Sequence, residues 1–563
     1  MKNASQKTKL SIFIKMASLY LACFFFSLML AAIFTILSAS QIKKYELQKA
    51  AIYAKNAQYP LKVSSTLILN SSNVFEAWQE GLQVIQEAST LQEVAQQSLQ
   101  SFSSGEATII THDTLTLLKE TNYSIQNLNS LLQKSLALRT LFGQSAIRQT
   151  QTISLQLPQI LELLELVNNN DINWVVLLNN SDELRASGGF MGSLAALATN
   201  KGTLQEAPKF YDIYDLSNRI ERVEEVPIGV RKYLSEGRGL ALTDANWEAD
   251  FTQSAPVILS FIDQSELPTT DVLVNINLNL IQDLLKITGP IQLIDSQKTV
   301  TSQNLSTLAR EDRLNFFSGD KQKKMFLTQL YQSLIEQLPK LDQRQQFRLL
   351  QLLATSFDQK QIIFYSPDQN TQQIFSKLGV TGAINYQTDY VLYLLESNVG
   401  INKANQGISR QINLKFQPTS LLIELNYENS NLPLSDNEKE LIRSNPDLKQ
   451  ADHLGYVNYQ RLIIDLAIDQ TQIICNGEAI NPDEISSITT QQGKATQIGF
   501  LFTVTEQSKT SCIITIQPKT PLRSNQSWTI IKQPGLPITS YQLTYFGKDE
   551  VFHLDQDKII GEI

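Results

Sequence analysis

The sequence predicts a multidomain chain of α/β and all-β parts: an N-terminal transmembrane helix, a helical stalk or bundle, a central α/β domain and a C-terminal β-sandwich. An uncharged apolar run opens the chain, and helical periodicity follows it. The apolar spacing then changes to strands alternating with helices, and finally to strands alone. Since 563 residues exceed what one hydrophobic core usually organises, we expect two or three domains beyond the apolar run.

The apolar run from Met16 to Leu37 has no charged side chain and is long enough to cross a hydrocarbon layer of roughly 30 Å as one helix. Four lysines and no acidic residue precede it: Lys2, Lys7, Lys9 and Lys15. By the positive-inside rule, this asymmetry predicts a cytoplasmic N-terminus. The chain is therefore expected to be a single-pass protein of the cell membrane, with its bulk extracytoplasmic.

We expect residues 1–15 to form a cytoplasmic tail and residues 16–38 the anchor, with the remainder outside from about Gln41. A cleaved signal peptide is the alternative, because Ser38-Ala39-Ser40 would serve as a small-residue cleavage site. Apolar signal cores, however, usually span only about 7–15 residues.

Net charge and cysteine content restrict the functional class. A net charge of −8, with lysine and arginine dispersed among acids, argues against a nucleic-acid partner. Cys23 lies inside the apolar run, which leaves Cys475 and Cys512 outside the membrane, where a disulfide can persist. The sequence leaves open whether these two pair or remain buried thiols.

Residues 43–168 are expected to form the helical stalk or bundle. Apolar side chains recur there at three- and four-residue steps: Val74, Trp78, Leu82 and Ile85, then Leu115, Leu118, Ile125, Leu128 and Leu132. Because no clean heptad is sustained, the pattern favours a short bundle over an extended coiled coil. A receptor-type signalling stalk would need a cytoplasmic output domain, which the short tail cannot form.

Residues 172–408 are expected to form the α/β domain. Short apolar runs predict these strands: Trp174–Leu178, Met191–Thr199, Val272–Ile276, Ile291–Leu293 and Ile362–Tyr365. Helical patterns alternate with them: Ser254–Ile262, Leu278–Thr288, Asn304–Ala309, Lys321–Leu338 and Gln343–Phe357. Such alternation predicts a sheet covered by helices.

Residues 410–563 are expected to form the β-sandwich. Apolar and polar side chains alternate there between Gly, Pro, Asn and Asp turns: Leu421–Tyr427, Tyr459–Ile468, Gln497–Thr505, Cys512–Gln517 and Trp528–Lys532. A stretch rich in charge and proline, Leu432–Gln450, is expected to be a long loop or short helix inserted before the sandwich continues.

The segment Asn179–Ser193, between two apolar strands, is the first candidate site. Its glycines, among them Gly188 and Gly189, would let backbone N–H groups approach an anion, and Arg185 offers a planar bidentate fork. The segment is neither a Walker A loop nor a nucleophile elbow. The alternative is a tight turn whose glycines allow unusual dihedrals and whose arginine pairs with a neighbouring acid.

The run Leu177–Ser193 resembles the signature of the DUF4012 family, which comprises bacterial membrane-anchored proteins without an established function. The same family resemblance continues through Asp212–Asp215, Leu242–Phe251, Leu285–Ile291 and Ser397–Lys403, so that it spans about Trp174 to Lys403. Further similarity lies at Val457–Tyr459 and Lys532–Gly535. The resemblance implies a membrane-anchored envelope protein.

A weaker resemblance is to the LytR-CpsA-Psr family, which attaches glycopolymers from a polyprenyl-pyrophosphate carrier to the bacterial cell wall. It is carried by Arg310-Glu-Asp312-Arg313, followed by Gly319 to Leu327, after Thr288-Gly289-Pro290. The chain lacks that family's Pro-Arg-Asp segment, and lysines stand where its arginines would be expected. If the chain is an enzyme, this resemblance implies a glycopolymer phosphotransferase.

A membrane-held pyrophosphate needs cations to neutralise it and carboxylates to hold a divalent ion. The candidate anion-binding residues are Arg185, Gly188, Gly189, Arg310, Arg313, Lys323 and Lys324. The candidate Mg²⁺ ligands are Asp244, Asp250 and Asp320. Each has a structural alternative: a solvated helix face for the lysines, and a turn or helix cap for Asp244. The sequence identifies no catalytic residue.

Two classes of function remain open. In the first, an anchored extracytoplasmic envelope protein binds a phosphorylated glycan or polyprenyl-pyrophosphate head group, with or without transfer of the glycan. In the second, the chain is a non-catalytic structural or adhesive surface protein. The expected partners are the membrane and, in the first class, a cell-wall glycan or its lipid-linked carrier; nucleic acid is excluded.

Overall fold

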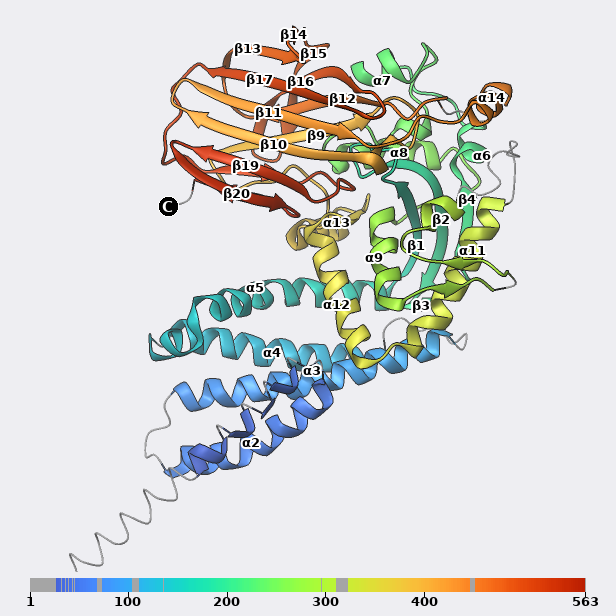
Figure 1. Ribbon diagram of the computed structural model, residues 1–563. Coiled ribbons are helices and arrows are strands. Elements are labelled where there is room, and N and C mark those ends of the chain that lie inside the picture. Colours follow the sequence, from blue (N-terminus) through green and yellow to red (C-terminus); the bar gives the residue numbers. More distant parts are fainter. Residues whose placement is uncertain are drawn as a thin grey trace, which may run out of the picture. The chain divides into compact units, whose positions relative to one another are not determined.

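The computed structural model describes most of the chain (Figure 1). The described residues are 27–31, 33–35, 37–38, 40–42, 44, 46–67, 73–103, 111–134, 136–294, 296–309, 322–445 and 451–561. The predicted tail at 1–15 lies outside them, as do residues 16–26, 32 and 36 of the predicted anchor. Within the described ranges, none of the helices has both the length and the apolar composition that a membrane crossing requires.

The chain divides into two compact units. The helical unit comprises the chain up to Asp171 together with Thr199–Gln205 and Ile335–Leu350. The sheet unit comprises Ile172–Ala198, Glu206–Leu334 and Gln351–Ile563. The chain thus passes from one unit to the other five times, at 171/172, 198/199, 205/206, 334/335 and 350/351.

Four long helices make up most of the helical unit: α2 (Leu47–Leu67), α3 (Asn73–Ser103), α4 (His112–Lys134) and α5 (Leu136–Asn169). Each packs against the next along the chain. Ala54, Ala57 and Leu82 are buried between α2 and α3, where the small side chains let the helices approach closely. The structure thus has helices in the N-terminal half, in the part of the chain where a helical stalk or bundle was expected.

Residues 335–350 bring a later part of the chain into the helical unit. They contain η3 (Leu338–Lys340) and the start of α12 (Gln343–Asp358). Gln92 of α3 donates a buried hydrogen bond of 3.2 Å from Nε2 to Oε1 of Gln346.

The first sheet lies in the region predicted to be α/β. Its strand order is β3-β2-β1-β5-β8, with β4 also paired to β2. The strands are β1 (Asp171–Asn180), β2 (Phe190–Asn200), β3 (Thr203–Leu204), β4 (Lys209–Asp212), β5 (Val272–Asn277) and β8 (Ile362–Tyr365). Strands β1 and β5 are parallel, with Asn179 opposite Asn277 at their carboxyl ends.

Helices and short helical elements connect and follow these strands along the chain. They are α6 (Ile213–Ser217), α7 (Ile228–Tyr233), η1 (Leu242–Asp244), α8 (Phe251–Ile262), α9 (Leu278–Thr288), α10 (Leu305–Leu308), α11 (Gln322–Gln337) and α13 (Gln369–Leu378). A two-stranded ribbon of β6 (Ile291–Gln292) and β7 (Thr299–Val300) stands apart. The core joins Leu177 of β1, Leu273 of β5 and Ile258 of α8.

The C-terminal part contains two sheets. One has the order β14-β13-β17-β11-β10-β19-β20, and the other β15-β16-β12-β9-β18-β21. The β10 sheet consists of β10 (Ile408–Gln417), β11 (Ser420–Asn429), β13 (Ile468–Cys475), β14 (Glu478–Ala479), β17 (Ser508–Pro518), β19 (Thr539–Tyr545) and β20 (Lys548–Leu554). The second consists of β9 (Tyr390–Asn398), β12 (Tyr456–Ile464), β15 (Glu484–Thr490), β16 (Gly493–Val504), β18 (Trp528–Ile531) and β21 (Lys558–Ile560).

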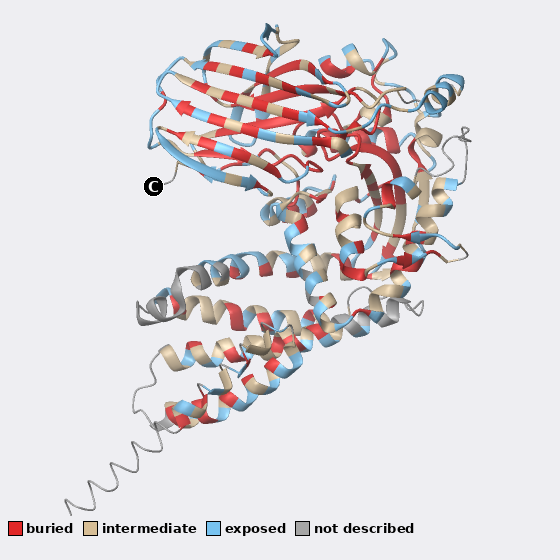
Figure 2. Ribbon diagram, viewed as in Figure 1, coloured by how far each residue is buried: buried red, intermediate tan, exposed pale blue. Residues whose placement is uncertain are grey.

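One core joins the two sheets. It contains Leu414 and Phe416 from the β10 sheet and Leu462, Phe500 and Trp528 from the sheet of β9. Buried residues alternate with more exposed ones along β10, β11 and β17 (Figure 2), as expected for strands that turn one face to a core. The expectation of a sheet-rich C-terminal half is confirmed.

Two local features refine this part. Helix α14 (Asp436–Ser444) occupies the predicted insertion and starts with a capping box between Ser435 and Glu438. Cys475 of β13 and Cys512 of β17 face each other in register and form a disulfide, with Cα atoms 4.0 Å apart. The structure thus favours the disulfide over two free thiols.

Candidate functional site

The candidate site is the β1–β2 loop, residues 181–189, which carries Arg185 and the two glycines. Every residue of this loop is buried. Its backbone is fixed by the amide of Phe190, which donates to the Glu183 carbonyl at 2.8 Å, and by the amide of Asn398 at the end of β9, which donates to the Leu184 carbonyl at 2.9 Å. The loop therefore lies between the first sheet and the sandwich instead of opening to solvent.

The guanidinium of Arg185 is buried, and both of its terminal nitrogens bind neighbouring groups of the chain. Its side chain is only 2% exposed, and Nη2 contacts Oε1 of Glu183 at 3.1 Å. Nη1 donates to the Leu184 carbonyl at 3.2 Å and also to the Asn398 carbonyl. Nε has no hydrogen-bond partner among the described residues. The side chain thus crosslinks its own loop to β9, and its planar fork is not presented to solvent.

A second cation shares the same carboxylate. Nζ of Lys403 forms a buried ion pair with Oε2 of Glu183 and lies 5.3 Å from the centre of the Phe190 ring. Asp244 in η1 adds a further acid nearby: burial raises the pKa of its carboxyl group, while the charge of Arg185 acts in the opposite direction. The cluster therefore contains two bases and two acids, so its charge is largely balanced internally.

The loop glycines allow chain segments to approach one another closely. Gly188 and Gly189 have φ angles of +115° and +148°. A Cβ atom on Gly188 would lie 1.9 Å from Oδ1 of Asn277, and one on Gly189 would lie 2.3 Å from the Asn180 carbonyl oxygen. These positions match the alternative of a tight turn, because the space beside them is already filled by protein atoms.

Asparagines to which the sequence analysis assigned no role surround the same loop. Asn179 donates from Nδ2 to Oδ1 of Asn275 at 2.6 Å, and Asn275 donates to the Ser187 carbonyl at 2.8 Å. Asn246 donates to Ser187 Oγ and to the Gly189 carbonyl, both at 2.8 Å. The sequence does contain a signal for this cluster: Asn179 and Asn275 are polar residues in otherwise apolar strands. The carboxyl ends of parallel strands meet at one edge of a sheet, so these two side chains could be expected to lie close together.

The predicted lysines of α11 contact acids of β4 and α6, and Lys323 also reaches Gly192 at the end of the candidate segment Asn179–Ser193. Nζ of Lys323 contacts Oδ2 of Asp212 at 3.0 Å and donates to the Gly192 carbonyl. Lys324 forms an ion pair with Asp215. About a third of each lysine side chain is exposed, at 33% and 31%. The two lysines therefore pair with acids at the start of α6, whose N-cap is Asp212.

Of the three predicted Mg²⁺ ligands, the structure describes Asp244 and Asp250. Asp250 is the N-cap of α8: it accepts bonds from Thr252 N at 2.9 Å, Thr252 Oγ1 at 2.6 Å and Ile384 N at 3.0 Å. Asp320 falls outside the described residues, as do Arg310 and Arg313. Over the described ranges, no group of three or more His, Cys, Asp or Glu side chains is arranged to hold a metal ion.

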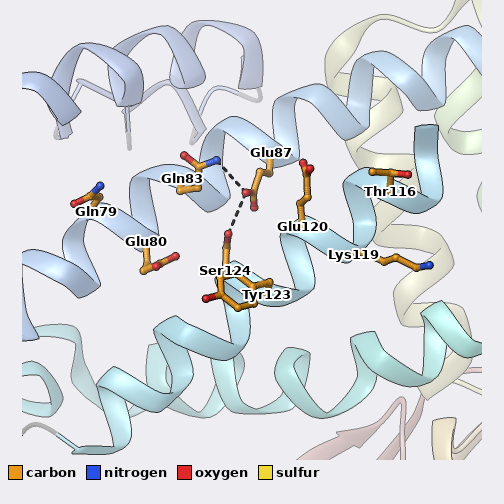
Figure 3. A pocket seen from close by; sticks show the side chains of 9 residues that line it. All are labelled: Gln79, Glu80, Gln83, Glu87, Thr116, Lys119, Glu120, Tyr123 and Ser124. Carbon is orange, nitrogen blue, oxygen red and sulfur yellow. Dashed lines mark hydrogen bonds between the residues drawn. The ribbon is translucent and has the colours of Figure 1, made fainter. Parts of the chain in front are cut away.

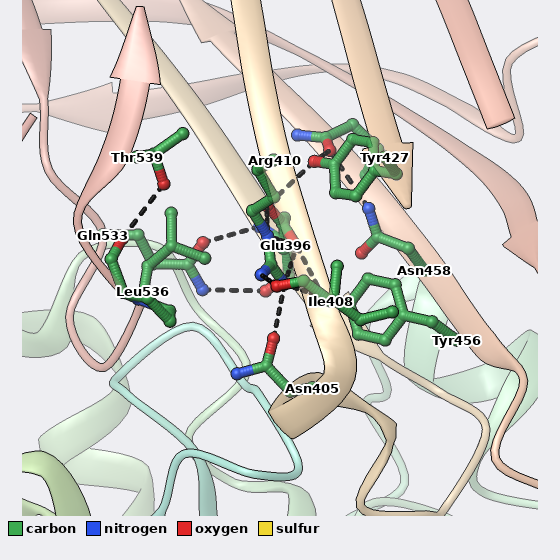
Figure 4. A network of polar contacts seen from close by, with 12 residues as sticks. Glu396, Asn405, Ile408, Arg410, Tyr427, Tyr456, Asn458, Gln533, Leu536 and Thr539 are labelled. Atoms are coloured by element: carbon green, nitrogen blue, oxygen red, sulfur yellow. Dashed lines mark hydrogen bonds and ion pairs between the residues drawn. The ribbon is translucent and has the colours of Figure 1, made fainter. Parts of the chain in front are cut away.

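A buried polar network extends from the loop into the sandwich (Figure 4). Glu396 accepts from Arg410 at 2.8 and 3.0 Å and from the hydroxyls of Tyr427 at 2.8 Å and Tyr456 at 2.6 Å. Gln533 connects this network to the loop, because its Nε2 donates to the carbonyls of both Glu396 and Arg185, at 2.8 and 3.2 Å.

A second connection lies at Arg461 of β12, whose Nη2 donates to the Trp247 carbonyl at 2.7 Å. Its guanidinium stacks 4.5 Å from the centre of the Trp247 ring. The candidate site is thus part of a continuous polar joint between the first sheet and the sandwich.

Comparison with known protein families gives a match over part of the chain. Residues 169–313 match the family described as Protein of unknown function (DUF4012). The match supports the DUF4012 assignment and covers β1, the β1–β2 loop, η1 and α8. No curated protein matches the chain. The resemblance to the LytR-CpsA-Psr family remains a prediction.

Proposed function

We propose that this chain, with its DUF4012 region at residues 169–313, is a membrane-anchored, extracytoplasmic envelope protein with a non-catalytic structural or adhesive role. The observation that carries the proposal is the internal pairing of the predicted anion-binding cations. Arg185 pairs with Glu183, Lys323 with Asp212, and Lys324 with Asp215.

The cost of freeing Arg185, whose ion pair is buried, supports a structural role. Breaking a buried ion pair costs about 3–5 kcal/mol, because it leaves an uncompensated charge in the interior. An anion that recruited Arg185 away from Glu183 would therefore lose about 10²- to 10⁴-fold in affinity. The same pairing holds the β1–β2 loop against β9, as a rigid connection between two parts of the sheet unit requires.

The envelope location rests on two observations. The uncharged run at residues 16–37, preceded only by basic residues, suits a single anchor with its N-terminus in the cytoplasm. The Cys475–Cys512 disulfide suits an oxidising compartment outside it. In this proposal, the stalk-like helical unit and the sandwich both lie outside the cytoplasm.

The second candidate function is binding of a phosphorylated glycan or polyprenyl-pyrophosphate head group, with Mg²⁺ and, as a further step, glycan transfer. It is favoured by one feature: Lys323 and Lys324 stay about one third exposed near the start of α11. Arg310 and Arg313 would have to join them.

Thermal unfolding of the full-length protein in detergent distinguishes the two functions. We expect no rise in the unfolding temperature with a polyprenyl-pyrophosphate analogue, with or without Mg²⁺. A bound ligand at a hundred times its Kd would add about 2.7 kcal/mol of stability, which this measurement detects readily. A rise that disappears in Lys323→Ala or Arg313→Ala, but persists in the surface control Lys519→Ala, would overturn the structural role.

A further inference from the structure

Lys403 and Glu183 form an ion pair that differs from the other ion pairs of the described residues. Among the lysine–carboxylate pairs within the described ranges, it is the only one in which both side chains are less than a tenth exposed, at 7% and 4%. The other buried pairs, Arg185 with Glu183 and Arg410 with Glu396, use arginine. A guanidinium is not deprotonated in proteins, whereas a lysine amine can lose its proton and become a nucleophile.

The fold brings this amine to the carboxyl group and holds the carboxyl group in place. Nζ of Lys403 contacts Oε2 of Glu183, while Nη2 of Arg185 lies 3.1 Å from the other carboxylate oxygen, Oε1. The ring centre of Phe190, which is itself buried, lies 5.3 Å from the same Nζ. The two groups are therefore positioned against each other in an interior that excludes bulk water, as a reaction between them requires.

Two other buried side chains show that burial alone does not create this arrangement. Glu87, between α3 and α4, is only 6% exposed, but its Oε1 accepts hydrogen bonds of 3.0 Å from Gln83 Nε2 and Ser124 Oγ (Figure 3). Lys532 is only 3% exposed, but its Nζ donates to two backbone carbonyls, at 2.7 and 2.6 Å. Neither set of contacts joins an amine to a carboxylate, as the contact between Lys403 and its acid does.

We propose that Lys403 and Glu183 form an isopeptide bond, which covalently links the β1–β2 loop to the segment between β9 and η4 (Ala404–Gly407). Nζ first transfers a proton to Oε2, which burial favours because two neutral groups are easier to bury than two charges. Nζ then attacks Cδ of Glu183, and Arg185 stabilises the negative charge that develops on Oε1. The bond from Cδ to Oε2 breaks, and Oε2 leaves as water with the first proton and a second proton from Nζ. One ammonium and one carboxylate thus give one amide and one water, and no other reactant is needed.

This bond fixes the connection between two parts of the sheet unit that are far apart in the sequence. It joins residues 220 positions apart, and such a crosslink restricts the unfolded chain as a disulfide does. The inference goes beyond the proposed structural or adhesive role and does not depend on it. Both residues lie within the sheet unit, and the bond changes the mass of the chain whether or not the protein binds an anion.

Peptide mapping of the full-length protein by mass spectrometry tests the inference. The protein is reduced, denatured and digested with trypsin, which cuts after arginine and lysine but not after an acylated lysine. We expect one branched peptide that joins residues 149–185 to residues 378–410, with a mass lower than the sum of the two by one water molecule. Trypsin should still cut after Lys532, which serves as the buried lysine control in the same digest.

Lys403→Arg is the matched variant, because it keeps a buried cation and removes the amine. We expect this variant to yield residues 149–185 and residues 378–403 as separate peptides of unmodified mass. Its reduced and denatured chain should also migrate more slowly in gel electrophoresis than the wild type, whose internal crosslink keeps the chain more compact. Separate, unmodified peptides from the wild-type protein would overturn the inference, and this digest is decisive even if the variant does not fold.

Discussion

Replacing Arg185 by alanine is expected to lower the free energy of unfolding by about 3–5 kcal/mol, the cost of breaking a buried ion pair. The structure gives the reason. The substitution removes the 3.1 Å contact with Glu183 and both donors to the carbonyls of Leu184 and Asn398. The loop then keeps the ion pair between Lys403 and Glu183, but two buried carbonyls lose a donor.

Urea unfolding followed by tryptophan fluorescence measures this loss, because Trp247 packs beside the same joint. Arg238→Ala is the matched control. Arg238 pairs with Glu236 at the surface, where the side chains are 56% and 71% exposed, and the change should cost less than about 1 kcal/mol. If Arg185→Ala is as stable as this control and abolishes binding of a pyrophosphate ligand, the structural interpretation of Arg185 is refuted.

Three further predictions concern the sheet unit. Burial lowers the pKa of Lys532 to about 7 in the folded protein. Between about pH 7 and 10 the unfolded chain therefore binds more protons than the folded protein does. The free energy of unfolding should rise over this range by up to about 1.4 kcal/mol per pH unit. The Lys532→Met variant should lack this contribution. If urea unfolding gave the same pH dependence of the free energy of unfolding in the wild type and in Lys532→Met, the prediction would be wrong. Replacing both Cys475 and Cys512 by alanine, which opens a link between residues 37 apart, should cost about 3–4 kcal/mol in the same assay, and an unchanged midpoint would argue against the disulfide. Gly189→Ala should lower the free energy of unfolding by more than about 2 kcal/mol, because its Cβ would collide with the backbone of Asn180. Gly477 has a φ of +88° and open space around it, so Gly477→Ala should cost only the backbone strain of about 1–2 kcal/mol. Equal losses in the two variants would exclude the steric explanation.

Local periodicity was sufficient to predict much of the secondary structure. The predicted helix Leu278–Thr288 coincides with α9, and the predicted strand Val272–Ile276 lies within β5. In these elements the buried side chains lie close together in the sequence, so their apolar spacing can be recognised from a short run of residues. Strand β9 was harder, because eight of its nine residues are buried and it therefore shows no alternation. It lies within residues 172–408 but pairs with β12 and β18 of the sandwich.

The surroundings of the candidate site could not be read from the sequence for a different reason. Arg185 donates to the carbonyl of Asn398, which is 213 residues away in the sequence. Lys403 pairs with Glu183, which is 220 residues away. Such contacts depend on the tertiary fold and leave no periodic signal. The choice between an anion-binding fork and an internal crosslink therefore required the structure.

The five passages of the chain between its two units mean that they cannot be separated as continuous fragments. A protein that ended at Asp171 would lose residues 335–350, and with them the hydrogen bond from Gln92 to Gln346. A protein that began at Ile172 would keep that segment but leave it without α3 to pack on. A genetic rearrangement that moves one continuous segment of the chain can therefore keep both units intact only if it moves them together.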